Sequence, residues 1–345
     1  MKKWNLDALY PSFESKEFQD SLILIEKLIE ESTSYALKEF NDTSDALNKI
    51  KAFIVKSEEL RSLLIRSFVF CSLTLATDAM NEEARKYLNK MQQLSSKTTL
   101  SSTKFSKWIP TIGNLDDLID SDELLTEVKY YLNRINEGSK YLLSDAEEII
   151  ISKLTQTGSS AWGQLQSELT ATLKVDYNGK EITLSEVRNL SSDKDPKVRK
   201  EAYIAELAAY PKVAQSVAYA LNGVKGEVNT LCELRGFESA LDQAVYQSRM
   251  DKSTLNALIE SMREYLPHFH KYLKRKGELL GHKNGLPYYD IFAPMGESSK
   301  EFTIDEAMEY IFKNFRTFSP GLEDLARRAK DEEWIDFTPR PGKRG

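Results

Sequence analysis

Apolar residues recur three and four positions apart over most of this chain, and that spacing predicts a mainly helical fold. Residues three or four apart lie on one face of a helix. Fifteen glycines and ten prolines in 345 residues are too few for an all-β fold, which needs a turn every ~8–12 residues. The two clearest apolar stripes are Phe18, Leu22, Ile25, Leu28 and Ile29, and Leu255, Leu258, Ile259, Met262, Leu266, Phe269 and Leu273.

Helix starts are marked by side-chain chemistry as well as by spacing. In a capping box, a Ser or Thr and the Glu three residues later satisfy backbone N–H groups reciprocally. A capping residue followed by Pro at the first helical position is a second signature. We find Ser144 with Glu147, Thr303 with Glu306, Asp195-Pro196 and Ser319-Pro320. Pro267 lies inside the second stripe and predicts a kink there.

One segment departs from the helical pattern. Residues 173–177 and 180–184 flank Asn178-Gly179, the dipeptide favoured in two-residue hairpin turns. A lone hairpin is marginal in water, so this one must pack on a helical body. We place a domain boundary near residue 185, which divides the chain into residues 1–185 and 186–345.

Charge and apolar content argue against nucleic-acid and membrane partners. The 53 acidic and 47 basic residues give a net charge of −6, spread evenly along the chain, with no basic face for a phosphate backbone. The N-terminus lacks the apolar core of a secretory signal. The longest apolar run, residues 67–76, is half a membrane span. Cys71 and Cys232 are predicted to be buried thiols in a reducing compartment, so we expect a cytoplasmic protein.

The three histidines lie close together in the sequence, at His268, His270 and His282. Two residues apart on a helix, His268 and His270 face different directions and cannot hold one ion, unlike a pair at i, i+4. Gly281 and Gly285 indicate that the helix ends before His282. We therefore predict surface or structural histidines and no metal site built from them.

Other motifs of catalysis are also missing. The sequence has no Gly-x-Ser-x-Gly elbow, phosphate-binding loop or dinucleotide fingerprint. Acidic pairs such as Glu147-Glu148 and Glu332-Glu333 are typical of solvated helix faces. Taken alone, the residues predict a helical body without an evident active site.

Six segments, in order along the chain, resemble the oligoendopeptidase F branch of the thimet-oligopeptidase-like zinc peptidases. They are Trp4–Tyr10; Gly158–Trp162 with Leu165; Asp193 with Val198-Arg199; Asn222 with Arg235–Ala240; Tyr288–Asp290 with Ala293-Pro294; and Trp334–Phe337 with Pro339–Lys343. Each segment alone is weak, but six in the family's order, spanning residues 4 to 343, are specific.

The resemblance implies a multi-helix ellipsoidal fold divided by a deep channel that admits short, unstructured peptides. Residues 1–185 would form a channel wall, and residues 186–345 would begin the zinc peptidase catalytic domain. In the family, a His-Glu-x-x-His helix and a further glutamate bind zinc, and the first glutamate acts as general base on the zinc-bound water. This chain ends at Gly345, before those residues. The resemblance thus implies zinc in a longer parent, an incomplete catalytic domain here, and no catalytic, cofactor-binding or metal-binding residue in this chain.

Three interpretations stay open at this point. The first is the N-terminal part of a cytoplasmic zinc metalloendopeptidase of short peptides, inactive on its own and exposing apolar surface after residue 185. The second is a naturally short, non-catalytic helical protein that binds peptides or serves as a scaffold. The third is a half-enzyme completed by a second chain. The sequence does not indicate an oligomeric state.

Overall fold

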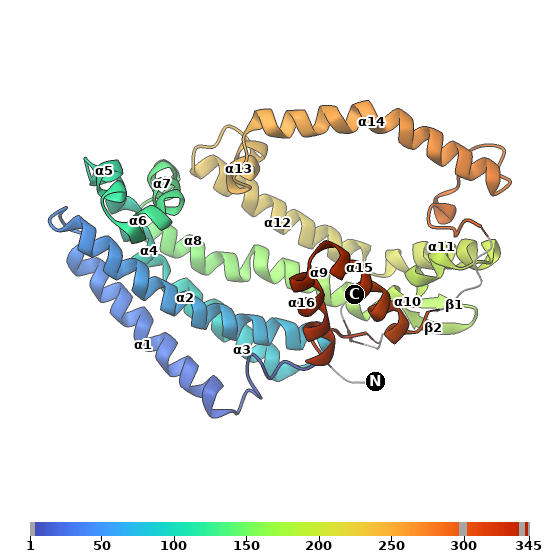
Figure 1. The fold of residues 1–345 in the computed structure, drawn as a ribbon, viewed down its shortest axis with the longest axis horizontal. Helices are drawn as coiled ribbons and strands as arrows, with labels where there is room; N and C mark the ends of the chain where they lie inside the picture. Colours follow the sequence, from blue (N-terminus) through green and yellow to red (C-terminus); the bar gives the residue numbers. More distant parts are fainter. Residues whose placement is uncertain (1–3, 297–301, 338–341, 344–345) are drawn as a thin grey trace.

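The computed structural model describes residues 4–296, 302–337 and 342–343. Within these residues the chain is helical apart from one two-stranded sheet (Figure 1). The helices of the first half are α1 (Lys16–Glu39), α2 (Ala46–Thr77), α3 (Glu82–Lys97), α4 (Thr99–Trp108), α5 (Leu115–Asp120), α6 (Glu123–Glu127), α7 (Lys129–Gly138), α8 (Asp145–Thr157) and α9 (Ser159–Thr172).

The sheet and the remaining helices follow. They are β1 (Lys174–Tyr177), β2 (Lys180–Thr183), α10 (Leu184–Asn189), α11 (Pro196–Ala209), α12 (Ala214–Leu234), α13 (Ala240–Gln247), α14 (Lys252–Leu279), α15 (Ile304–Phe318) and α16 (Pro320–Asp331). Short 3-10 turns are η1 (Ile109–Thr111), η2 (Ser139–Tyr141), η3 (Leu190–Ser192), η4 (Tyr210–Lys212) and η5 (Tyr288–Asp290). The predicted mainly α fold is confirmed.

All four predicted helix starts are confirmed, and three of them carry a side-chain cap bond. Ser144 and Thr303 each form a complete capping box, and the Asp195 side chain accepts from the Lys197 N–H ahead of α11. Ser319 makes no side-chain cap bond to α16. The same residue ends α15, where its N–H donates to the Phe315 carbonyl, so its backbone serves two helices.

Two hydrophobic clusters hold the first half together. One lies where the N-terminal segment meets α1, α2 and α3; Tyr10 at its centre is fully buried, and its ring packs edge-on against Phe18. The other lies at the opposite ends of α1 and α2. There Phe53 of α2 packs with Phe105 and Trp108 of α4 and with apolar residues of α5, α6 and α7. Figure 1 shows α1 and α2 as long neighbouring helices, and both contribute residues to each cluster.

Helix α2 has the length and hydropathy that a membrane span requires, by composition alone. The apolar run from residue 67 to 76 did not indicate this, because the helix extends 21 residues further toward the N-terminus. Only 28% of its most apolar window is buried. Its Leu60, Phe70 and Leu75 side chains belong to the first cluster.

The hairpin forms at the predicted position. Val175 pairs with Ile182, and the turn residues Asn178 and Gly179 have φ of 51° and 76°, the left-handed pair that this turn requires. A third hydrophobic cluster joins β1 to α10 and α11 through Val175, Val187 and Ala202. The hairpin therefore rests on helices, as expected. This cluster contains residues on both sides of residue 185, and the predicted boundary stays a prediction.

The second half is more open than the first. Helices α8 and α9 run through the middle of the molecule, α12 lies beside α9, and α14 arches across the top from α13 toward η5 (Figure 1). Pro267 lies inside α14, and the helix changes direction along its length in the same view. Most of its apolar stripe is exposed, with Met262 at 59% and Phe269 at 61%.

The two ends of the described chain meet. The Asn5 N–H donates to the Glu333 carbonyl at 2.9 Å, and the Ala79 N–H, in the turn between α2 and α3, donates to the Gly342 carbonyl at 2.8 Å. The first and last of the six segments therefore lie side by side. Pro339–Pro341, within the last segment, are outside the described residues.

Candidate functional site

The histidines do not come together. His268 and His270 are exposed on α14, whereas His282 lies beyond the end of that helix and binds Asp290. Gly281, with φ of 83°, provides the expected helix ending. In residues 4–296, 302–337 and 342–343, no group of three or more His, Cys, Asp or Glu side chains could hold a metal ion. The residues that the structure describes therefore do not fit a zinc site.

A buried ion pair joins two of the six segments. Arg199 on α11 donates through Nε to Asp290 Oδ1 at 2.7 Å, and the two side chains are 3% and 1% exposed. Its Nη1 donates to the Asp193 and Lys194 carbonyls at 2.7 and 3.0 Å. The other oxygen of Asp290 lies 2.6 Å from His282 Nε2. This network fixes η5 against α11, and sequence spacing offered no signal that these residues would meet.

Another segment forms the seam between α9 and α12. The Glu227 carboxylate on α12 accepts from the Ser159 N–H at 2.6 Å and from the Ser159 and Thr155 hydroxyls at 2.8 Å each. Burial by itself would raise the pKa of Glu227, but these hydrogen bonds outweigh it, so the pKa lies below its ordinary value. A Cβ at Gly158 would lie 2.3 Å from Glu227 Oε2, which explains the glycine before Ser159.

In the acidic pair Glu147-Glu148, Glu147 is exposed as predicted, but Glu148 is buried, and the prediction was wrong for Glu148. Its side chain is 8% exposed and accepts two hydrogen bonds from Arg235, at 2.7 and 2.8 Å. Burial would raise the pKa of Glu148, but the bonds from Arg235 and from the Leu143 N–H outweigh it, and the pKa is lowered. Sequence reasoning missed this pair because Arg235 lies 87 residues away.

A pocket of about 580 Å³ lies between α10, α11 and η5, within the usual size of small-ligand sites. Aromatic side chains form much of its wall, with Tyr203 5.7 Å from Tyr288 and 5.9 Å from Tyr289 between ring centroids. Arg199 also lines it. At one edge, Arg188 donates to Glu206 at 2.8 Å. We call this the aromatic pocket.

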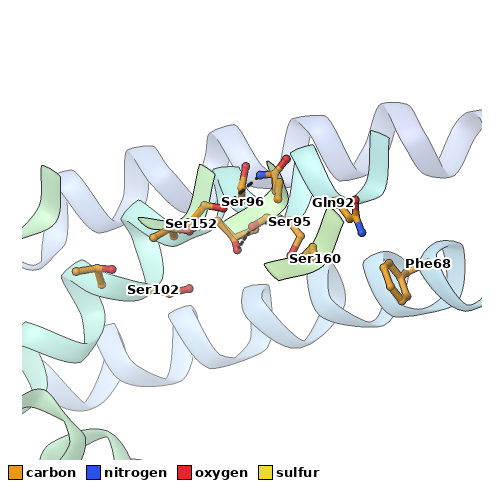
Figure 2. A pocket seen from close by; sticks show the side chains of 11 residues that line it. Phe68, Gln92, Ser95, Ser96, Ser102, Ser152 and Ser160 are labelled. Carbon is orange, nitrogen blue, oxygen red and sulfur yellow. Dashed lines mark hydrogen bonds between the residues drawn. The ribbon is translucent and has the colours of Figure 1, made fainter. Parts of the chain in front are cut away.

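A second pocket, of about 450 Å³, has a different chemistry. Figure 2 shows serine hydroxyls and the Gln92 amide around it, with Phe68 as its one aromatic side chain. None of its lining residues is charged. Thr99 donates to Ser152 across it at 2.8 Å. Because several other hydroxyls bond to main-chain carbonyls of their own helices, including Ser96 and Thr98, much of this polar lining serves the helix ends.

The overall architecture is that of the helical oligopeptidases. It resembles the crystal structure of oligoendopeptidase-F from Enterococcus faecium with a TM-score of 0.67 and 15% identity, covering 95% of this chain and 69% of that one. It resembles PZ peptidase A, solved with an inhibitor, with a TM-score of 0.72 and 17% identity, covering 93% and 56%.

Sequence comparison leads to the same group. The Oligopeptidase F model matches residues 113–174 and the Peptidase family M3 model matches residues 189–345. Group B oligopeptidase PepB of Streptococcus agalactiae is 24% identical over 77% of this chain, and an oligoendopeptidase F homolog of Lactococcus lactis is 21% identical over 99%. The chain belongs to the oligoendopeptidase F branch of peptidase family M3. It spans 47% and 57% of the length of those two relatives.

Proposed function

We propose that this chain forms the N-terminal part of a cytoplasmic zinc metalloendopeptidase that hydrolyses short, unstructured oligopeptides. In this proposal it provides a wall of the peptide channel and the start of the catalytic domain. The zinc and its ligands belong to sequence outside residues 1–345, and these residues alone are inactive. Family membership supports the peptide-bond chemistry, and the two relatives named above are about twice as long as the part they share with this chain.

The observation that carries the proposal is the exposed apolar face of α14. Leu258, Met262 and Phe269 lie on one side of this helix and are 48%, 59% and 61% exposed. Contiguous apolar surface of this kind marks a place where another protein segment packs. A further catalytic segment would bury it, and α14 would then become part of the channel rim.

The proposed compartment and partners have their own support. Cys71 and Cys232 are buried and unpaired, as expected of thiols kept reduced in the cytoplasm. The even spread of charge around a net −6 supports peptides rather than nucleic acid as partners. We propose no membrane contact for α2, because its buried residues belong to the core.

The test joins intact mass with activity. The natural protein is purified from its source, its mass is measured, and a short quenched fluorescent peptide is assayed with and without a zinc chelator. A mass well above 39.4 kDa with chelator-sensitive cleavage is the expected result. A 39.4 kDa protein that binds the peptide without cleaving it would replace this proposal with the scaffold interpretation. Cleavage that needs a second, separately encoded chain would support the half-enzyme instead.

A further inference from the structure

The aromatic pocket is lined by a buried arginine that has one N–H group without an acceptor among the residues that the structure describes. Arg199 is 3% exposed and lines the pocket. Its Nε and Nη1 donate to Asp290 and to two carbonyls, whereas its Nη2 makes no hydrogen bond within the described part of the chain. A buried donor without an acceptor is costly, so an acceptor entering the pocket would be favoured.

The charges around the pocket are already balanced. Arg199 is paired with Asp290, and Arg188 with Glu206, at 2.7 and 2.8 Å. The Tyr210 hydroxyl donates to the same Glu206 carboxylate. Bringing a further net charge into this partly enclosed place would carry a desolvation cost with no free counter-charge to offset it. The pocket therefore suits an uncharged ligand.

The walls define the rest of the ligand. Tyr203, Tyr288, Tyr289 and Phe292 line a space of about 580 Å³, enough for an aromatic side chain with its adjoining main chain. Tyr288 and Phe292 are 69% and 64% exposed, so these rings are available to a ligand and their removal leaves the core intact.

We propose that the aromatic pocket binds an aromatic residue within a peptide, its ring against Tyr288 and Phe292 and its main-chain carbonyl accepting from Arg199 Nη2. The proposal deepens the proposed function, because it assigns a residue preference to the peptide ligand. It concerns binding alone and involves no bond cleavage. It therefore stands or falls separately from the peptidase assay.

The test measures binding of three capped amino acids to the 345-residue chain by ligand-observed NMR. N-acetyl-phenylalaninamide has the ring and neutral carbonyls, N-acetyl-glycinamide lacks the ring, and N-acetyl-phenylalanine carries a carboxylate. We expect the first to bind at least about fivefold more tightly than the glycine compound, which lacks the aromatic contacts. It should also bind more tightly than the carboxylate, whose charge would have to be desolvated. Equal binding of the glycine compound, or tighter binding of the carboxylate, would overturn the proposal.

Variants locate the site. Tyr288→Ala combined with Phe292→Ala should weaken binding of N-acetyl-phenylalaninamide about fivefold or more. Tyr272→Ala, on the exposed face of α14 (57% exposed), is the matched control and should not change it. Unchanged binding in the double variant, or an equal loss in the Tyr272 variant, would show that the probe binds elsewhere.

Arg199→Lys tests the donor. Lysine keeps the positive charge beside Asp290 but lacks Nη2, so we expect about tenfold weaker binding of the amide probe. Circular dichroism melting verifies that the variant is folded. If it is not, the result rests on the Tyr288/Phe292 pair, whose exposed positions spare the fold. A folded Arg199→Lys variant with unchanged affinity would remove the carbonyl contact from the proposal.

Discussion

The indole of Trp162 on α9 lies against the backbone of Gly223 on α12, so closely that a Cβ at position 223 would be 2.4 Å from the indole Cδ1. Together with the bonds from Ser159 to Glu227, this contact joins the segment Gly158–Trp162 to α12, on helices about 60 residues apart in sequence. The family pattern at Gly158–Trp162 is therefore a packing pattern, which holds the two halves of the chain together.

Gly223→Ala should destabilise the protein by about 1–3 kcal/mol, because the added methyl group forces Trp162 out of its place. Gly226, on the same helix, has nothing within 4 Å of its Cβ position. Gly226→Ala is therefore the control and should be neutral or stabilising by up to about 1 kcal/mol. Urea denaturation measures both, and equal stability of the two variants would contradict the close contact.

Asp290→Asn should be more damaging, at about 3–5 kcal/mol, because it leaves the buried Arg199 guanidinium without its counter-charge. Asp324→Asn is the control, since Asp324 is exposed on α16. Thermal unfolding followed by circular dichroism compares them. If Asp290→Asn lowers the free energy of unfolding by less than about 1 kcal/mol, the charge of Asp290 is not needed to stabilise the buried Arg199.

Glu227 makes the stability of the α9–α12 seam depend on pH. Its pKa is lower in the folded chain than its ordinary value of 4.5, so its carboxylate stabilises the fold above about pH 4.5 and loses that contribution as the pH falls through the folded pKa. Glu227→Gln should therefore cost stability at pH 7 and narrow its gap to wild type as the pH falls below 4.5. Glu233→Gln, exposed on the same helix, should show no such convergence.

Cys71 should not react with thiol reagents while the protein is folded. The side chain is fully buried, and burial raises the pKa of its thiol to about 12, so almost no thiolate exists at pH 8. Labelling with dithionitrobenzoate at pH 8, before and after unfolding in guanidinium chloride, measures this. Rapid labelling of Cys71 in the folded chain would show that the first hydrophobic cluster opens.

The exposed stripe of α14 should make the isolated 345-residue chain self-associate as its concentration rises. Met262→Glu with Phe269→Glu should reduce that association, whereas Asn256→Glu, which adds the same charge at an exposed polar position, should have a smaller effect. Light scattering after size-exclusion chromatography measures the mass. A wild-type chain that stays monomeric at high concentration would contradict the prediction that the α14 stripe drives self-association.

Local chemistry was readable from the sequence because its causes lie within a few residues. Asn178-Gly179 requires left-handed backbone, Ser144 and Glu147 satisfy each other's N–H groups, and the spacing of apolar residues determines which helix face they share. At Ser319 the predicted helix start is also confirmed, but the side chain makes no cap bond, and the same residue ends α15.

Contacts between distant residues could not be read in this way. Nothing near Glu148 indicates that Arg235 will pair with it, and the same holds for Arg199 with Asp290 and Trp162 with Gly223. An apolar stripe also looks the same whether it is buried, as in α1, or exposed, as in α14. Amphipathic spacing specifies a face, but only the tertiary arrangement supplies what covers it.

The sequence by itself thus determined the helical class, the hairpin, most helix starts and, through six ordered segments, the family. The tertiary structure decided which charges are buried in pairs, which apolar face stays exposed, and where an aromatic pocket forms with an unused donor at Arg199. The physical reason is range: backbone conformation and capping depend on neighbours along the chain, whereas burial and pairing depend on neighbours in space.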